Sequence, residues 1–208
     1  MILGKPALVY AIEAAKETNL FTEIHVSTDS LDIASLAESN GAIARNLREQ
    51  SLSGDHTKTI EVVSSFLKSQ TMFNKQVDFV CCIYPITPLL TANRILEGFD
   101  LVTAFPSEFS IAASPLNSHP NRTFMVSDNK MISLNSKKYI DSRTQDLPPF
   151  YQDAGQFYWG KKVSWETKKP IFGINSTIVE MPSNSVIDID EPGDWTAALE
   201  LYLRNQKD

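Results

Sequence analysis

The sequence of 208 residues predicts an α/β protein in which helices flank a mainly parallel sheet. Helical periodicity and short apolar runs alternate along the first half, which is the pattern of a sheet built from strand and helix units. Residues 77–84 are nearly all apolar, as expected of a strand buried on both faces. The length fits one domain, 1–208, within which residues 107–152 differ in texture.

Three helices are expected before the buried run. The first extends from Pro6 to about Asn19, with an apolar stripe and a proline in its first turn. The second follows a cap at Ser30 or Asp29 and ends near Gly41. The third is marked by apolar residues at helical spacing: Ile60, Val63, Phe66 and Leu67.

Shorter elements are expected on either side of the buried strand. A strand is predicted at 23–27 and a brief extended piece at 42–44. The Pro-Ile-Thr-Pro run at 85–88 closes the buried strand with a rigid turn. A short helix over 91–98 and a further strand over 100–105 follow.

Residues 107–152 are rich in Ser, Asn, Pro and charge, and predict a β-rich excursion from the sheet. Weak strands at 123–126 and 130–134 flank the turn residues 127–129, so a β-hairpin is expected there. The excursion would serve as a lid or as a dimerisation arm.

Composition narrows the classes of function. Lysine and arginine number 19 against 25 acidic residues, a net charge of −6, and they form no basic stripe for nucleic acid. Neither a long apolar run nor a leader peptide is visible, so no membrane span and a cytoplasmic location are expected. The adjacent Cys81 and Cys82 would face opposite sides of a strand as buried, reduced thiols. Three scattered histidines give no zinc-site spacing.

An acidic stretch follows strands expected at 157–160 and 172–180. Asp188 and Asp190 would point to the same side of an extended backbone, where two carboxylates could hold Mg²⁺ together with substrate phosphates. Alternatively, one of them binds metal at most, and the other caps the terminal helix with Asp194. The spacing leaves both interpretations open.

Polar residues near other strand ends are candidates for ligand contacts. Arg48 could hold a base oxygen or a phosphate, and Thr59 could donate a hydroxyl, although taken alone these residues are better explained as a solvated loop cation and an ordinary helix start. The rigid turn after Tyr84, which contains Thr87, could support a base or a sugar, or could simply end the strand. The segment from Arg143 to Gly160 mixes an arginine, amides, carboxylates and aromatic rings, which favours binding of a polar sugar acid.

Six runs stand in order along nearly the whole chain: Leu3-Gly4-Lys5-Pro6-Ala7-Leu8, Val26-Ser27-Thr28-Asp29, Ile83-Tyr84-Pro85-Ile86-Thr87-Pro88-Leu89-Leu90, Ser142-Arg143-Thr144-Gln145-Asp146-Leu147, Asp153-Ala154-Gly155-Gln156-Phe157-Tyr158-Trp159-Gly160 and Ile187-Asp188-Ile189-Asp190. As a set they resemble the acylneuraminate cytidylyltransferases, which make CMP-activated nonulosonic acids. Within that family, the third and fifth runs are most similar to the branch that activates pseudaminic acid.

The resemblance implies a Rossmann-like sheet, a homodimer, and transfer of CMP from CTP to a nine-carbon sugar acid, with Mg²⁺ as cofactor and pyrophosphate as the second product. It implies that Asp188 and Asp190 bind the metal and are catalytic. The residues expected to bind the nucleotide are Arg48, Thr59, Tyr84 and Thr87. Those expected to bind the sugar acid are Arg143, Gln145, Asp153, Gln156 and Tyr158.

One part of the family pattern has no counterpart in these residues. The family opens with a strand and a phosphate loop of the type A-A-R-x-G-S-K, whereas this sequence starts at the Gly4-Lys5-Pro6 that normally follows. That strand would lie between the strands at 23–27 and 77–84, so unpaired strand edges are expected there. Two hypotheses result: a Mg²⁺-dependent cytidylyltransferase, or a non-catalytic remnant that keeps a sugar-acid or dimer surface.

Overall fold

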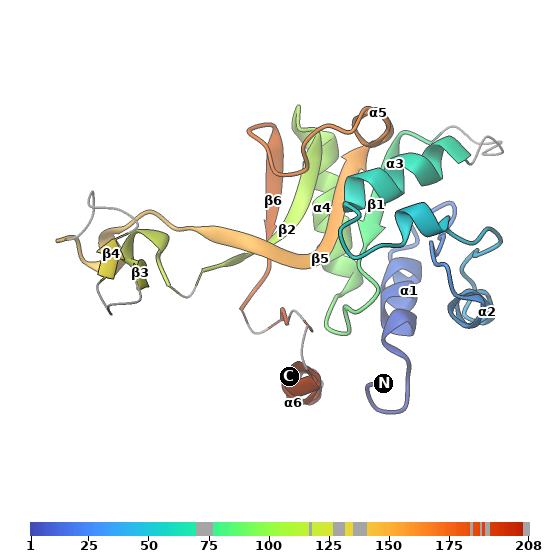
Figure 1. The fold of residues 1–208 in the computed structure, drawn as a ribbon, viewed down its shortest axis with the longest axis horizontal. Helices are drawn as coiled ribbons and strands as arrows, with labels where there is room; N and C mark the ends of the chain where they lie inside the picture. The colour runs from blue at the N-terminus through green and yellow to red at the C-terminus, as the bar shows by residue number, and fades with distance from the viewer. Residues whose placement is uncertain are drawn as a thin grey trace.

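The computed structural model describes residues 1–69, 77–116, 118–126, 132–134, 141–183, 185–187, 189 and 192–205. Its centre is a four-stranded sheet with the order β1-β5-β2-β6. These strands are β1 (Phe79–Ile83), β2 (Phe109–Pro115), β5 (Tyr151–Lys161) and β6 (Ser176–Glu180). Helices cover both faces of the sheet (Figure 1). The predicted class, an α/β fold with a sheet flanked by helices, is confirmed.

One strand of this sheet is reversed. β2 and β6 pair in parallel, whereas β5 is antiparallel to both of its neighbours, β1 and β2. Among the four strands, β1, β2 and β6 therefore share one direction and β5 runs against them. At eleven residues, β5 is also long enough to extend beyond the sheet.

The predicted helices of the first half and the C-terminal helix are confirmed. They are α1 (Ala7–Glu17), α2 (Leu31–Ser39), α3 (Thr59–Ser69) and α6 (Pro192–Asn205). The Ser30 hydroxyl oxygen accepts a hydrogen bond from the Ile33 N–H (3.4 Å) and so caps α2 as expected. Four further helical elements were not predicted: α5 (Lys162–Glu166) and the short 3₁₀ helices η1 (Gln50–Leu52), η2 (Pro120–Arg122) and η3 (Thr144–Asp146).

Two expectations about the middle of the chain are wrong. Residues 100–105 do not form a strand, because α4 (Ala92–Ala104) continues through them. Its buried residues Ile95, Gly98 and Val102 follow helical spacing, which outweighs the strand preference of the local Val and Thr. No strand of the central sheet was predicted between residues 106 and 157 either, so the buried strand β2 was missed.

The segment predicted as a strand at 23–27 makes only one bridge. His25 pairs in parallel with Ile43, through the Val26 N–H to the Ile43 carbonyl (2.9 Å) and the Ile43 N–H to the Ile24 carbonyl (2.8 Å). Within the described part of the chain, β1 pairs with β5 and has no strand on its other side. The expected unpaired edge of β1 is thus present.

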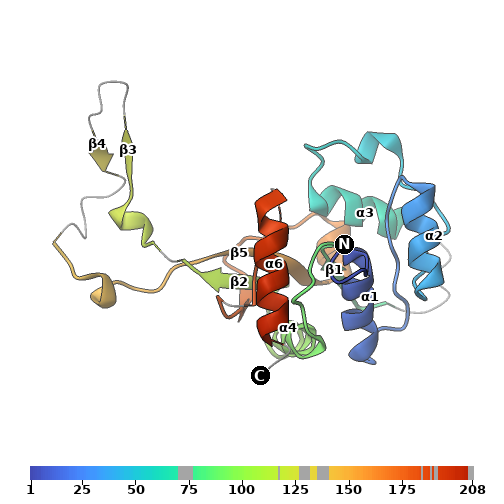
Figure 2. The same ribbon diagram turned by 90° about the horizontal axis from the view of Figure 1, so that it is seen from below.

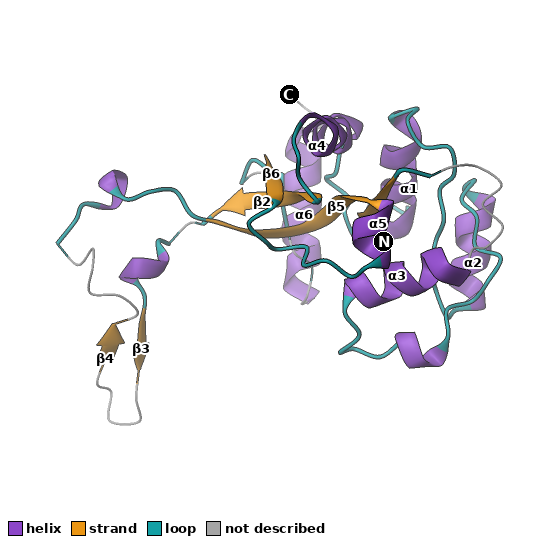
Figure 3. Cartoon of the chain, turned by 90° about the horizontal axis from the view of Figure 1, so that it is seen from above, coloured by secondary structure: helices purple, strands orange, loops and turns teal. Residues whose placement is uncertain are grey.

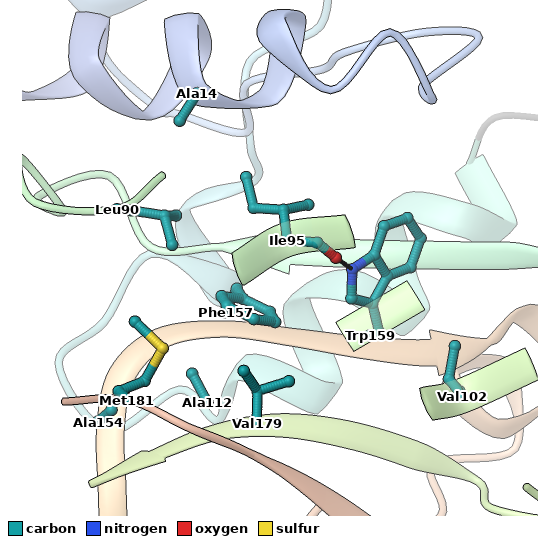
Figure 4. Packing of buried hydrophobic residues seen from close by; sticks show 10 residues of the cluster. All are labelled: Ala14, Leu90, Ile95, Val102, Ala112, Ala154, Phe157, Trp159, Val179 and Met181. Carbon is teal, nitrogen blue, oxygen red and sulfur yellow. Dashed lines mark hydrogen bonds between the residues drawn. The ribbon is translucent and has the colours of Figure 1, made fainter. Parts of the chain in front are cut away.

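The largest buried cluster joins the sheet to α4 and α1 (Figure 4). At its centre the Trp159 indole N–H of β5 donates a hydrogen bond to the Ile95 carbonyl of α4 (2.8 Å). A second cluster on the opposite face packs α3 and α5 against Phe109 and Tyr158. The core therefore holds β5 from both sides, and β5 carries most of the predicted sugar-acid residues.

The predicted hairpin is present as an arm that projects away from the sheet (Figures 1 and 2). β3 (Phe124–Val126) pairs antiparallel with β4 (Ile132–Leu134), whereas the turn residues 127–129 lie outside the described residues. The chain enters the arm after β2 and returns at β5, where the Leu116 N–H donates to the Phe150 carbonyl (2.9 Å). We use the word arm for the described residues between 116 and 150.

Helices long and apolar enough to span a bilayer are not found anywhere in the described part of the chain.

Candidate functional site

Four oxygen-bearing side chains from three elements meet where β1 ends. The Thr59 hydroxyl at the start of α3 hydrogen-bonds with the Tyr84 hydroxyl, which follows β1 (2.9 Å). On β5 the Tyr158 hydroxyl donates to Asp153 Oδ2 (2.5 Å). The Tyr84 and Tyr158 rings pack edge to face with centroids 5.5 Å apart, which joins the two pairs. We call these four residues the hydroxyl row.

Tyr158 is the most enclosed member of the hydroxyl row. It is 2% exposed, and its ring packs among Leu67, Phe109 and Trp165. Burial, the hydrogen bond to Asp153 and the neighbouring Tyr84 hydroxyl raise its pKa far above the ordinary value for tyrosine. Tyr158 therefore stays a neutral phenol whose proton lies on the Asp153 side.

A distortion of β5 brings Asp153 and Tyr158 together. Residues 154–157 of β5 lie opposite the single residue Ala112 of β2, between the pairs Ile111–Tyr158 and Ala113–Asp153. Gly155 has φ +58°, a conformation that glycine adopts at little cost, and its N–H donates to Asp153 Oδ1 (3.1 Å). The two carboxylate oxygens of Asp153 therefore accept hydrogen bonds from Gly155 inside the bulge and from Tyr158 at its end.

Gln156 lies inside this bulge and is 2% exposed. Its Nε2 donates to the Ala154 carbonyl (3.2 Å), while its Oε1 has no hydrogen-bond partner among the described residues. A buried amide oxygen without a donor is costly, so this oxygen is a candidate acceptor for a ligand group. The Gln156 carbonyl also accepts from the Tyr84 N–H (2.9 Å), which fixes the bulge to the end of β1.

The turn after Tyr84 is held from within. The Thr87 side chain is fully buried, and its hydroxyl donates to the Tyr84 carbonyl (3.1 Å). In this arrangement Thr87 shapes the turn, and the exposed groups of the turn are Pro85 and Ile86.

Arg48 lies in the loop before α3 and is partly buried. Its Nε donates to Ser53 Oγ (3.1 Å), and its Nη2 lies 3.9 Å from Asp29 Oδ1. Its backbone N–H donates to the Thr28 carbonyl (2.7 Å). These contacts connect the loop to the Thr28-Asp29 run that follows the extended segment at residues 24–26.

The remaining predicted site residues lie apart from the hydroxyl row or outside the described residues. Arg143 and Gln145 are exposed on the arm, beside or within η3, and Figure 3 shows the arm reaching away from α3 and β1. Asp188 and Asp190 are not among the described residues. In the chain that is described, no three His, Cys, Asp or Glu side chains gather as metal ligands.

The two cysteines are free thiols on opposite faces of β1, as predicted, although each is only partly buried rather than fully buried. Cys81 belongs to the α4 side of the sheet and Cys82 to the α3 side, so they face opposite ways. Burial raises the pKa of Cys82 to about 12, and that of Cys81 well above its ordinary value. The protonated form of both thiols is therefore favoured, which argues against a nucleophilic role.

The sequence did not reveal how Asp153 is used. On a regular strand, residues 153 and 158 would face opposite sides, so their hydrogen bond depends on the bulge. Gly155 was the available signal, because a glycine inside a strand often marks a bulge. The contact of Arg48 with Asp29 had no spacing signal, since it joins two separate loops.

Comparison with known proteins gives a family match over almost the whole chain. The family model described as Cytidylyltransferase matches residues 1–206. A pseudaminic acid cytidylyltransferase of Campylobacter jejuni is 33% identical over 99% of this chain and 88% of that protein. An N-acylneuraminate cytidylyltransferase A of Danio rerio is 28% identical over 98% of this chain and 46% of that protein.

A solved structure supports the fold. CMP:2-keto-3-deoxy-manno-octonic acid synthetase, complexed with CTP, superposes with a TM-score of 0.71 over 99% of this chain and 90% of that chain, at 14% identity.

Proposed function

Because this chain belongs to the cytidylyltransferase family, we propose that it transfers CMP from CTP to a nonulosonic acid of the pseudaminic or sialic type. The anomeric hydroxyl oxygen of the sugar acid forms a bond to the α-phosphorus of CTP. The bond from that phosphorus to the bridging oxygen breaks, pyrophosphate leaves, and the hydroxyl proton passes to solvent or a base. The observation that carries the proposal is the similarity over 99% of the chain to a pseudaminic acid cytidylyltransferase.

The position of the hydroxyl row suits a nucleotide site. Ligands of open α/β sheets bind beyond the carboxyl ends of the parallel strands, and Tyr84 follows the carboxyl end of β1. Thr59, in contact with Tyr84, and Arg48 in the preceding loop are proposed to contact the nucleotide. Gln156, with its unpartnered Oε1 among the described residues, is proposed to accept a hydrogen bond from the sugar acid. Asp153, Tyr158 and Thr87 would support these contacts.

We propose that Asp188 and Asp190 hold Mg²⁺. Ile187 and Ile189 both pack against the cluster formed by α1 and α6. Residues two apart face the same side of an extended backbone, so this packing agrees with the extended segment expected here. Mg²⁺ requires only one or two carboxylates when substrate phosphates supply further oxygens. When bound, the ion would neutralise negative charge that develops on the phosphates.

In a homodimer, Arg143 and Gln145 of one copy would be able to reach the hydroxyl row of the other copy, although they lie apart from the hydroxyl row of their own chain. The arm carries these two residues away from the body of its own subunit (Figure 2). It also exposes apolar strand β3, whose Met125 is 70% exposed. We infer that the arm of one copy packs against the other and supplies Arg143 and Gln145 to the site there. A cytoplasmic location and the absence of nucleic-acid partners remain predictions.

The proposed function is tested by pyrophosphate release. We expect release from the purified chain that requires CTP, pseudaminic acid and Mg²⁺ together. Asp190→Asn should reduce turnover at least about a hundredfold, because an interaction with the developing charge is lost. Asp32→Asn on the exposed face of α2 is the matched control and should leave turnover unchanged. No release with all three components present would contradict the proposal and favour the non-catalytic remnant.

A further inference from the structure

His119 connects the two chain segments at the base of the arm. It lies on the outgoing segment, directly before η2, and Pro148 and Phe150 lie on the returning segment. His119 Nε2 is 3.2 Å from the Pro148 carbonyl oxygen, and the His119 ring packs edge to face on Phe150 with centroids 4.6 Å apart. His119 Nδ1 is 3.2 Å from the Asn121 nitrogen. One imidazole ring therefore contacts both segments.

The partners of the two ring nitrogens determine where the proton of His119 lies. A carbonyl oxygen only accepts, so Nε2 must donate to Pro148. A backbone N–H only donates, so Nδ1 must accept from Asn121 and carries no proton. Both hydrogen bonds form together only in the neutral ring with its proton on Nε2.

A second proton on this ring would bind to Nδ1, which caps η2. His119 is the N-cap residue of η2, and its side chain accepts from the Asn121 N–H. A protonated Nδ1 is a donor that faces another donor, so the cap is lost, whereas the hydrogen bond from Nε2 to Pro148 can remain. Histidine changes charge between about pH 5 and 8. Acid within that interval would therefore release η2 from the ring.

The groups around His119 do not supply another charge change in that interval. Its partners on the returning segment, the Pro148 carbonyl and the Phe150 ring, are uncharged. The nearest charged residues along the chain are Arg122 in η2 and Asp146 in η3. Arginine and aspartate ordinarily keep their charge where histidine loses it. His119 is thus the group through which mild acid would act on the base of the arm.

The cap of η2 affects β3, because η2 leads directly into that strand. The Thr123 N–H and hydroxyl, between η2 and β3, both donate to the Pro120 carbonyl (3.2 Å and 2.6 Å). All three apolar residues of β3 are more than half exposed. These are the side chains proposed to pack against a second copy. Loss of the cap would loosen the turn that orients them.

We propose that His119 is a positioning residue for the arm, and that its protonation weakens the association of two copies. The inference rests on the proposed function, because pairing through the arm is part of it, and adds regulation by pH. The neutral ring holds η2 and β3 in the orientation that binds the other copy. Association would be tightest above about pH 7 and would weaken as the pH falls toward about 5.

The test measures the dissociation constant of the dimer by analytical ultracentrifugation at about pH 7.5 and about pH 5.5. We expect the wild type to associate at least about tenfold more weakly at the lower pH, because each of two arms loses one hydrogen bond of ordinary net strength. His119→Asn should associate equally at both pH values, because its side-chain oxygen accepts from the Asn121 N–H and does not titrate. His119→Ala should associate weakly at both.

His56→Gln is the matched control, because His56 is an exposed histidine in the loop before α3. This variant should keep the pH dependence of the wild type. Nitrogen-15 NMR of the His119 ring gives a readout that does not depend on association. We expect the proton on Nε2 at neutral pH, and weaker protection of the Asn121 amide from hydrogen exchange at the lower pH. In His119→Asn that protection should not change with pH.

The outcomes separate this inference from the proposed assembly. A wild-type chain that is monomeric at both pH values would overturn the assembly, and this inference with it. Association that does not change with pH in the wild type would overturn the inference alone. A pH dependence that persists in folded His119→Asn and His119→Ala would do the same. A His119 proton found on Nδ1 at neutral pH would also overturn it, because the cap could not form.

Discussion

At the scale of single residues, Glu108 connects α5 to the start of β2. Its Oε1 accepts from Lys169 Nζ (2.6 Å), and its Oε2 accepts from the buried Ser164 hydroxyl. The hydrogen bond from Lys169, followed by that from Ser164, lowers the pKa of Glu108 below its ordinary value. The carboxylate form is therefore favoured in the folded chain.

This lowered pKa predicts a pH-dependent contribution to stability. The contribution is fully present above the ordinary glutamate pKa and is lost as pH falls through the lowered value, because the unfolded chain then binds the proton more readily. Lys169→Met should lower the free energy of unfolding by about 0.5 to 1 kcal/mol near neutral pH, as expected for a partly exposed pair. Urea unfolding should show the difference from wild type shrinking below about pH 4.

Lys58→Met, which removes a surface charge elsewhere, is the control and should not reproduce this pH profile. An effect of Lys169→Met that stays constant across the acidic range would show that Glu108 does not titrate through this pair.

The sequence identified most residues of the candidate site but not what each does. Thr59 and Tyr84 were named from strand and helix ends, and their contact agrees with that placement. Asp153 and Tyr158 were both assigned to the sugar acid, yet their polar groups bind each other. A pairing that depends on a bulge cannot be obtained from the two-residue period of a strand.

At the scale of elements, α4 packs closely against β5 at Gly98. A Cβ added at Gly98 would lie 2.7 Å from Phe157 Cε2 and 2.8 Å from Trp159 Cδ1, on rings that are almost fully buried. Glycine thus permits the helix to approach the strand, at the cost of helix propensity.

Gly98→Ala should therefore destabilise the fold. Overpacking of this kind costs about 1 to 3 kcal/mol. The melting temperature should fall by about 2 to 4 °C for each kcal/mol in a chain of this length. Gly193→Ala in α6 is the matched control, because its Cβ would meet nothing within 4 Å. A melting temperature for Gly98→Ala equal to that of the control would contradict the described packing.

Elements whose apolar residues recur with a clear helical or strand period were predictable from the sequence, whereas elements defined by tertiary contacts were not. α1, α3 and β1 follow their apolar patterns. β2 is Phe-Ser-Ile-Ala-Ala-Ser-Pro, whose small and polar residues suggested an excursion, although burial between β5 and β6 makes it a core strand. In α4, a Val-Thr run suggested a strand, but packing against the sheet stabilises a helix there instead.

At the scale of the whole molecule, the arm suggests how two copies would share their sites. If the arm works on the other subunit, each site combines the body of one chain with Arg143 of its partner copy. A mixture of Arg143→Ala and Asp190→Asn chains would then contain mixed dimers with one intact site. Random pairing of equal amounts should restore about a quarter of wild-type turnover.

Size-exclusion chromatography with light scattering provides the companion measurement. Met125→Asp on the exposed face of β3 should shift the chain toward monomer and reduce turnover, whereas Leu31→Asp, an equally exposed apolar residue of α2, should do neither. If the mixture of variants is inactive although dimers form normally, the arm contributes its residues to the site of its own subunit.

A final consequence follows from the length of β5. Trp159, near its far end, is clamped against Phe21 and Phe99 in the core, whereas Tyr151, at its beginning, stands at the root of the arm. One strand therefore joins the core to the arm through the bulge that holds Asp153 and Tyr158. Contacts made by the arm would act on the backbone at these two residues, so the association of two copies would affect the geometry of the site.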